Sequence, residues 1–311
     1  MTNNANEMRV AKNMQTQERS KRNLAPLFVI LGALCWGTYG SFVTKISAWG
    51  LGQNALVSIR FLFTALPMFL FLLCKDPGKL KIPKKDMPLF LANGIVSIVF
   101  FTSCYTAAIR YTKIATAAAL LYTAPAIVLI LSAILFKEKL TGKKIICVLF
   151  SVLGCALCSG LAGGADLTRK GLLLGLGAGL GYALYSIFSR YIQMRGYTTY
   201  TNILYTFGIA TIVYIVMACV DGSAQNSIQH PEAIALAALC GLVTGCAAYI
   251  LYTEGLSKMA PPTASVLATI EPVTAAILGV VLFGQTLSIM EIMGIVLVVG
   301  SVTAMNVGHR S

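Results

Sequence analysis

Charged side chains are scarce in this chain of 311 residues. Asp, Glu, Lys and Arg together make up 11% of the sequence, against about 25% in an ordinary soluble domain. Hydrophobic residues reach 57% and the mean hydropathy is +0.78. A soluble protein of this length could not cover its surface with so few charges, and the same composition excludes disorder and a collagen-like repeat. The remaining class is an integral membrane protein with many spans.

The residues that most often carry chemistry are also few. The sequence has 2 histidines, His230 and His309, and neither has the neighbours of a metal site or a catalytic triad. No Walker-type GxxxxGK[ST] motif occurs. The 9 cysteines lie in or beside apolar runs, and the CxxC of Cys155 and Cys158 fits helix packing better than redox chemistry. We therefore expect no metal, no cofactor and no enzymatic activity.

Long apolar segments fill the rest of the chain after a basic stretch, residues 1–23. Each has about 19–23 residues, enough for a helix to cross a bilayer core of about 30 Å. Backbone embedded in lipid must satisfy its own hydrogen bonds, so the segments are predicted to be helices. The sequence thus predicts an all-α integral membrane protein with ten transmembrane helices. They are residues 25–46, 54–74, 88–109, 114–136, 143–161, 171–192, 199–220, 233–253, 261–283 and 288–307.

The basic residues indicate the orientation of the chain. If the N-terminus is cytoplasmic, 18 Lys and Arg residues fall on the inner side and 5 on the outer side, while Arg60 lies within a span. Positive charge collects on the cytoplasmic side of membrane proteins. We expect a multi-pass protein of the cell (cytoplasmic) membrane with both termini in the cytoplasm. The net charge of +13 then reflects topology and not a nucleic-acid partner.

The two halves of the sequence resemble each other. Residues 105–140 align with residues 252–287 without a gap, so that Tyr105-Thr106 meets Tyr252-Thr253 and Pro125 meets Pro272. WGTY (36–39) aligns with YALY (182–185). Because each half has an odd number of spans, the second half enters the membrane in the opposite orientation, as in many secondary transporters. The domains are predicted to be a cytoplasmic tail (1–23), two inverted five-helix repeats (24–161 and 162–307) and a cytoplasmic C-terminus (308–311).

Several motifs carry a resemblance to a known family. They are WGTYGSFVTK (36–45), Arg60-Phe61, APAIVLILSAILFKEKLT (124–141) and TIEPVTAAILGVVLFGQTLS (269–288). The chain resembles the ten-helix EamA-type transporters of the drug/metabolite transporter superfamily. The resemblance implies export of small organic solutes such as amino acids, metabolites or drug-like compounds. It also implies a central cavity between helices one, three, four, six, eight and nine.

Two charged residues lie well inside the predicted spans, away from the span ends. Glu271 is near the middle of its span, beside Pro272, where a carboxylate costs at least a few kcal/mol unless it has a partner, a cavity or a proton. It could couple protons, bind a substrate amine or anchor the structure. Arg60 could snorkel, reach a polar group of the bundle or bind a substrate carboxylate.

Aromatic and small polar residues are the other candidates for the cavity. A Tyr in a bundle offers a flat apolar face and one hydroxyl, which suits an apolar or aromatic solute, although the same residues could simply pack or form an interfacial belt. With Glu271, the candidate substrate-binding residues are Trp36, Tyr39, Asn93, Tyr122, Thr123, Tyr182, Tyr185, Tyr249 and Thr269.

Taken together, these features favour a secondary transporter that works by alternating access. An intramembrane lipid-modifying enzyme and a channel are the alternatives. The partners are predicted to be a small-molecule substrate and the bilayer. The glycine run LLLGLGAGLG (172–181) allows close helix approach, either within the bundle or to a second protomer, so the protein is expected to be a monomer or a homodimer.

Overall fold

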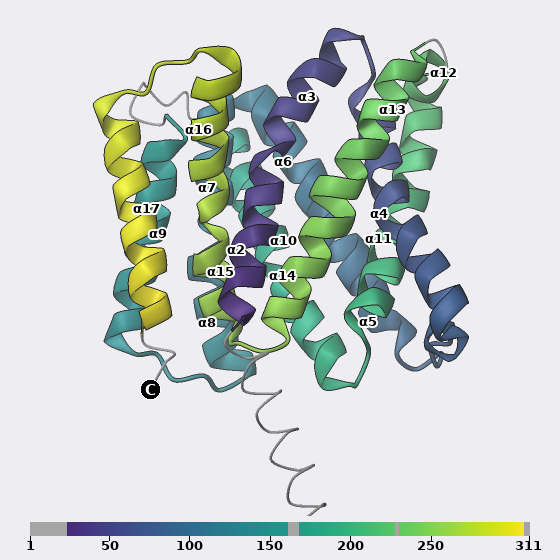
Figure 1. Ribbon diagram of the computed structural model, residues 1–311, viewed down its shortest axis with the longest axis horizontal. Coiled ribbons are helices and arrows are strands. Elements are labelled where there is room, and N and C mark those ends of the chain that lie inside the picture. The colour runs from purple at the N-terminus through teal and green to yellow at the C-terminus, as the bar shows by residue number, and fades with distance from the viewer. Residues whose placement is uncertain (1–23, 161–167, 228–229, 308–311) are drawn as a thin grey trace, which may run out of the picture.

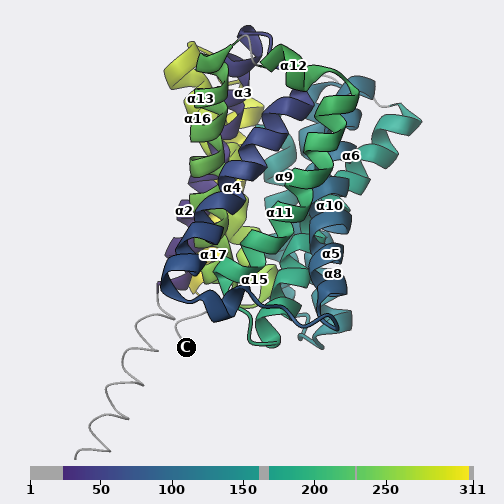
Figure 2. The ribbon, with the colours of Figure 1, turned by 90° about the vertical axis from the view of Figure 1, so that its right-hand side faces the viewer.

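The computed structural model describes residues 24–160, 168–227 and 230–307, and every regular element in these ranges is a helix. The helices stand side by side between two faces (Figures 1 and 2). We call the face where α2 begins and α17 ends the terminal face, at the bottom of Figure 1, and the other the opposite face. The part of the chain described is thus a helical bundle, as the sequence predicts.

The helices form ten spans, several of them built from two or three consecutive elements. Between them lie the short helices η1 (Pro77–Leu80) and α12 (Ser223–Ser227). In chain order the spans are α2 (Ala25–Gly37) with α3 (Tyr39–Ala48); α4 (Gln53–Lys75); α5 (Met87–Leu91) with η2 (Ala92–Val99) and α6 (Phe100–Tyr111); α7 (Ile114–Leu121) with α8 (Ala124–Leu135); α9 (Gly142–Cys158); α10 (Arg169–Met194); α11 (Thr199–Val220); α13 (Pro231–Cys240) with η4 (Gly241–Ala247) and α14 (Ala248–Leu256); α15 (Pro261–Ala268) with α16 (Ile270–Phe283); and α17 (Ile289–Val307).

By length and composition, nine of the described helical stretches could cross a membrane. The remaining one, α9, has 17 residues, which gives a helix of about 25 Å at 1.5 Å per residue and falls at the short end of membrane spans. It stands beside α17 through most of the bundle (Figure 1). The ten-helix prediction is confirmed, with α9 as the fifth span.

The packing of the spans follows the sequence repeat. Span 1 packs on span 8 (α2 on α14), and span 6 packs on span 3 (α10 on α6), which is the reciprocal pair. Spans 2 and 7, 4 and 9, and 5 and 10 pack on their own counterparts, as Figure 2 shows for α4 and α11. Five crossings bring the chain to the opposite face, so α10 starts there and runs antiparallel to α2. The architecture is therefore two inverted repeats around a pseudo-two-fold axis.

Glycines allow the closest helix contacts. A Cβ on Gly294 of α17 would lie 2.6 Å from the backbone nitrogen of Cys158, so α9 and α17 meet backbone to backbone. In the glycine run of α10, Gly175 and Gly179 face Leu120, and a Cβ on Gly181 would lie 2.9 Å from the backbone of Phe101. The run thus packs within the bundle, one of the two alternatives that the sequence leaves open.

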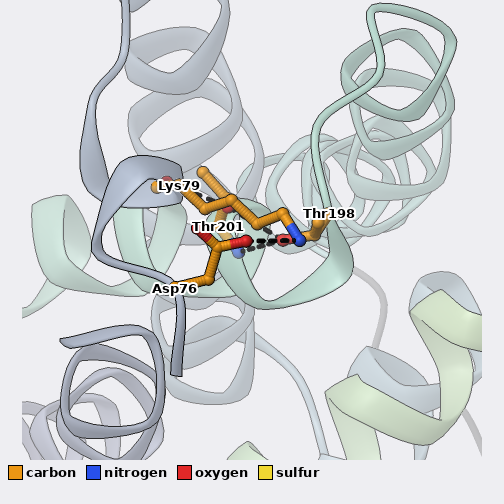
Figure 3. A network of polar contacts seen from close by, with 4 residues as sticks. All are labelled: Asp76, Lys79, Thr198 and Thr201. Carbon is orange, nitrogen blue, oxygen red and sulfur yellow. Dashed lines mark hydrogen bonds and ion pairs between the residues drawn. The ribbon is translucent and has the colours of Figure 1, made fainter. Parts of the chain in front are cut away.

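A polar network joins the two halves at the terminal face (Figure 3). Thr198 caps α11 by accepting a hydrogen bond from the Thr201 backbone N–H at 3.2 Å, and the Thr201 hydroxyl donates to the Lys79 carbonyl at 3.2 Å. Lys79 forms an ion pair with Asp76 at 2.8 Å. The Tyr205 hydroxyl donates to the Leu80 carbonyl beside it. The connection between α4 and α5 is therefore fastened to the start of α11.

Candidate functional site

Three spans are interrupted near their middle, and each interruption has a threonine. Thr38 separates α2 from α3, Thr123 separates α7 from α8, and Thr269 separates α15 from α16. Each hydroxyl donates to the carbonyl three residues earlier, at 2.7, 2.7 and 2.6 Å respectively. Side chains thereby satisfy carbonyls that the broken helices leave free. Thr123 and Thr269, two of the predicted cavity residues, thus bond their own backbone.

Two further spans widen into π-helix at equivalent places. They are η2 (Ala92–Val99) in span 3 and η4 (Gly241–Ala247) in span 8. Short π-helical segments inside longer helices occur frequently at functional sites. Spans 1, 3, 4, 8 and 9 therefore all carry irregular backbone near mid-span, and only span 6 of the six predicted cavity helices is regular. At membrane depth such backbone is tolerated only where protein buries it or it lines a cavity.

Glu271 lies beside two of these interruptions. It is in the first turn of α16, directly after the Thr269 break, and its residue is partly accessible. The Tyr182 hydroxyl of α10 donates to its Oε2 at 3.3 Å, and the Tyr122 hydroxyl faces the same carboxylate. A Cβ on Gly37 would lie 2.8 Å from the Glu271 carbonyl oxygen. The carboxylate thus sits where spans 1, 4, 6 and 9 meet.

Arg60 reaches a polar group of the bundle and does not snorkel. Its side chain belongs to α4 and the residue is 7% exposed. Nε donates to Thr244 Oγ1 at 3.0 Å and a terminal N–H donates to the Thr244 carbonyl at 3.2 Å, both in the π-helix η4. The guanidinium carbon lies 4.4 Å from the centre of the Tyr39 ring, a cation–π contact. Within the described residues no carboxylate pairs with it at 4.0 Å or less.

Aromatic rings enclose a small cavity next to Glu271. Trp36 is at its centre, with ring centroids at 5.0 Å from Tyr249, 5.1 Å from Tyr252 and 6.1 Å from Tyr182. The cavity measures about 10 Å³, so the rings are almost closed on one another. Trp36 is 5% exposed, and its indole Nε1–H has no hydrogen-bond partner among the described residues. A buried donor without a partner costs free energy, which a ligand with an acceptor would recover. The lining residues are Trp36, Ile98, Phe101, Tyr182, Tyr185, Ser186, Tyr249 and Tyr252.

Asn93 is the predicted cavity residue that the structure places away from these rings. It is fully buried in η2, and its amide donates to Asn202 Oδ1 at 3.0 Å and to Thr206 Oγ1 at 2.9 Å, both on α11. The Asn202 amide donates in turn to Ser189 Oγ at 2.9 Å. These bonds use its polar atoms to join span 3 to span 7, so here Asn93 holds the halves together.

Of the predicted site residues, the structure brings Trp36, Tyr182, Tyr185 and Tyr249 into the aromatic cavity. Tyr252, which lies near the end of its span, is not among the predicted cavity residues, although its alignment with Tyr105 in the repeat was an available signal. Thr244 could be expected to add a hydrogen bond within the bundle, but no pattern in the sequence connects it with Arg60.

Comparison with known families decides the membership of the chain. The model of the EamA-like transporter family matches residues 23–160 and again residues 169–307, once for each half. The chain belongs to the EamA-like transporter family. It is therefore a multi-pass membrane transporter, and the resemblance seen in the sequence is confirmed.

Similar EamA-like chains occur in bacteria and archaea. The chain is 26% identical to an uncharacterized transporter of Clostridium kluyveri, over 89% of this chain and 91% of that one. It is 27% identical to an uncharacterized transporter of Archaeoglobus fulgidus (86% and 90% covered) and 27% identical to the uncharacterized transporter YwfM of Bacillus subtilis (89% and 92% covered). A crystal structure matches with a TM-score of 0.76 at 19% identity, over 92% of this chain and 97% of the other. That likeness supports the fold alone.

Proposed function

We propose that this transporter is a secondary transporter that moves small organic solutes by alternating access around Glu271. The observation that carries the proposal is the irregular backbone of spans 1, 3, 4, 8 and 9 near mid-span. Discontinuous helices near the midplane, where inverted repeats meet, are the usual binding site of secondary transporters. Broken and π-helical segments also let the two ends of a span tilt independently.

The walls of the site favour a flat, largely apolar solute that carries a hydrogen-bond acceptor. Tyr182, Tyr185 and Tyr249 offer ring faces for stacking, and the Trp36 N–H is an available donor. The hydroxyls of Tyr185 and Tyr252 already have protein partners, so these residues contribute ring surface to the site and no free hydrogen-bonding group. The cavity has to open before a solute of that kind can enter.

The direction of transport completes the proposal. The excess of Lys and Arg at the terminal face favours a cytoplasmic position for that face, and the family resemblance favours export through the cytoplasmic membrane. A labelled solute found by an efflux screen in an exporter-deficient strain would then be tested in proteoliposomes. Saturable flux with trans-stimulation is the expected result. Flux that does not saturate would indicate a channel, and lipid turnover an enzyme.

Glu271 has a separate test, because it could couple protons, bind an amine or anchor α16. Glu271→Gln keeps the shape and the hydrogen bond from Tyr182 but removes the charge. Coupling predicts a lower rate and a lost pH dependence, whereas an anchor predicts an unchanged pH profile. Glu254→Gln is the matched control, since Glu254 lies at the terminal end of α14 in a 3.8 Å ion pair with Lys258.

A further inference from the structure

The inverted repeats contain a matched pair of tyrosine and threonine residues. The alignment of residues 36–39 with residues 182–185 pairs Tyr39 of span 1 with Tyr185 of span 6. The alignment of residues 105–140 with residues 252–287 pairs Thr106 of span 3 with Thr253 of span 8. Because the repeats are inverted, Tyr185 and Thr253 lie in the half of the bundle nearer the terminal face. Tyr39 and Thr106 lie in the half nearer the opposite face.

The pair nearer the terminal face is joined. The hydroxyls of Tyr185 and Thr253 lie 2.7 Å apart, and these residues are 4% and 0% exposed. Directly beside them, the hydroxyls of Ser186 and Tyr252 also lie 2.7 Å apart. About two turns further along α10, the Gln193 amide donates to the Thr253 carbonyl at 2.8 Å. Hydrogen bonds therefore join spans 6 and 8 from the lining of the aromatic cavity toward the terminal face.

The equivalent pair nearer the opposite face is not joined. No hydrogen bond links Tyr39 to Thr106 in the part of the chain that the structure describes, and both residues are partly accessible. The Tyr39 ring instead lies under the Arg60 guanidinium. The same residue types are thus hydrogen-bonded to each other in one repeat and not in the other.

A second contact closes the terminal face only. Asp86, just before α5, pairs with Arg195 and accepts a hydrogen bond from the Tyr197 hydroxyl at 2.6 Å, which joins span 3 to the turn between spans 6 and 7. In the alignment that pairs Tyr39 with Tyr185, Trp49 and Leu51 stand where Arg195 and Tyr197 would be. The opposite face therefore has no counterpart of this ion pair at those positions.

We propose that the two Tyr–Thr pairs are reciprocal gates of the transporter. In the structure the gate of Tyr185 and Thr253, nearer the terminal face, is joined, and the gate of Tyr39 and Thr106, nearer the opposite face, is not. When the inverted repeats exchange conformations, the Tyr185–Thr253 bond breaks and Tyr39 leaves Arg60 to bond Thr106. The inference rests on the proposed alternating access, and it names the residues that close each side.

The test uses pairs of cysteines in a chain whose 9 native cysteines are replaced. A tyrosine spans too long a distance for its replacement to form a direct disulfide with the partner, so the probe is the short cross-linker 1,2-ethanediyl bismethanethiosulfonate. We expect Y185C/T253C to cross-link at least tenfold faster than Y39C/T106C in the resting protein. Adding Asp86→Asn, which loosens the terminal face, should speed Y39C/T106C. Glu138→Gln is the matched control, because its 3.2 Å ion pair with Lys144 lies within one repeat, between spans 4 and 5.

Hydrogen exchange supplies a readout that does not depend on how well the cysteine pairs are tolerated. In the otherwise native chain, Tyr185→Phe with Asp86→Asn should raise exchange around Ser186 and Tyr252 and lower it in α3 and α6. Equal cross-linking rates of the two pairs, or exchange that rises on both sides together, would overturn the gates. None of these measurements needs a solute. If cross-linking and hydrogen exchange show reciprocal gates but no solute gives saturable flux, the proposed function is refuted and this inference is not. If flux is saturable but the two pairs do not respond reciprocally, this inference is refuted and the proposed function is not.

Discussion

The contact between Arg60 and Thr244 gives a prediction whose size can be worked out. Thr244→Val keeps the shape of the side chain but removes the hydroxyl that accepts from Arg60 Nε at 3.0 Å and donates to the Cys240 carbonyl at 2.9 Å. In water-soluble proteins a hydrogen bond to a charged group is worth about 1.5–3 kcal/mol. Interhelical hydrogen bonds in membranes average about 0.6 kcal/mol, with a maximum near 1.7 kcal/mol.

The environment decides between these values. Arg60 is 7% exposed and keeps its bond to the Thr244 carbonyl, so the variant leaves the charge buried with one acceptor fewer. We therefore expect the upper part of the membrane range, about 1–1.7 kcal/mol of lost unfolding free energy. That loss corresponds to roughly a 5- to 18-fold change in the unfolding equilibrium constant, since each 1.4 kcal/mol is about tenfold.

The assay is reversible unfolding in mixed micelles or steric trapping in bicelles. The matched control is Thr303→Val, because Thr303 is exposed on α17 and donates to the Val299 carbonyl at 2.7 Å, with no bond to a charged group among the described residues. Comparing the two variants isolates the contact with Arg60 from the loss of a helix back-bond. Equal effects of the two substitutions would refute the view that Thr244 holds Arg60.

Three further predictions concern the terminal face, the helix contacts and the aromatic cavity. The Tyr197 hydroxyl first and Arg195 second hold the pKa of Asp86 below its ordinary value, and Asp86 raises the pKa of Tyr197 to about 12. The stabilising effect of the Asp86 contact with Arg195 and Tyr197 is then complete above the ordinary carboxyl pKa of about 3.9. It is lost as the pH falls through the lowered pKa of Asp86 in the folded protein. The protection factors of the amides near Tyr197, which are exchange rates corrected for the intrinsic pH dependence of amide exchange, should therefore stay constant from about pH 5 to about pH 9. A change of the protection factors within that range would contradict the assignment. Gly241→Val should destabilise the fold by at least about 1–3 kcal/mol through overpacking, because even a Cβ there would lie 2.6 Å from the Arg60 carbonyl; a stability equal to that of Gly208→Val, where the space is open, would refute this. Trp36→Phe keeps a ring but removes the Nε1 donor, so the apparent affinity for a solute that carries an acceptor should fall about tenfold. An equal loss of affinity for an analogue of that solute without the acceptor would show that the donor is not used.

The sequence predicts the fold in most of its detail, because each span must satisfy its own hydrogen bonds and therefore shows its length directly. The ten segments match the ten spans, and the observed packing of the spans follows the sequence repeat. Mid-span interruptions are harder to see. Pro125 and Pro272 mark the breaks of spans 4 and 9, but the break at Thr38 has no proline beside it.

The candidate site is predicted only in part, since partners are chosen by tertiary packing. Glu271 and the aromatic residues stand out because a charge or a ring in a span is unusual. Asn93 stands out for the same reason, yet its amide is used up by Asn202 and Thr206, neither of which any local pattern connects with it. The partner of Arg60 was equally hidden, because a threonine in an apolar helix is common.

Accessibility from the two sides of the membrane tests alternating access most directly. Single cysteines replace Tyr39, which lies nearer the opposite face, and Ser186, which lines the aromatic cavity and bonds Tyr252. A membrane-impermeant thiol reagent is then applied from one side at a time. The account predicts that Tyr39→Cys reacts from the opposite face while Ser186→Cys is protected, and that this pattern reverses when the solute from the efflux screen is loaded on the terminal side. Simultaneous reaction of both positions, or no reversal with a solute that the protein is known to move, would contradict it.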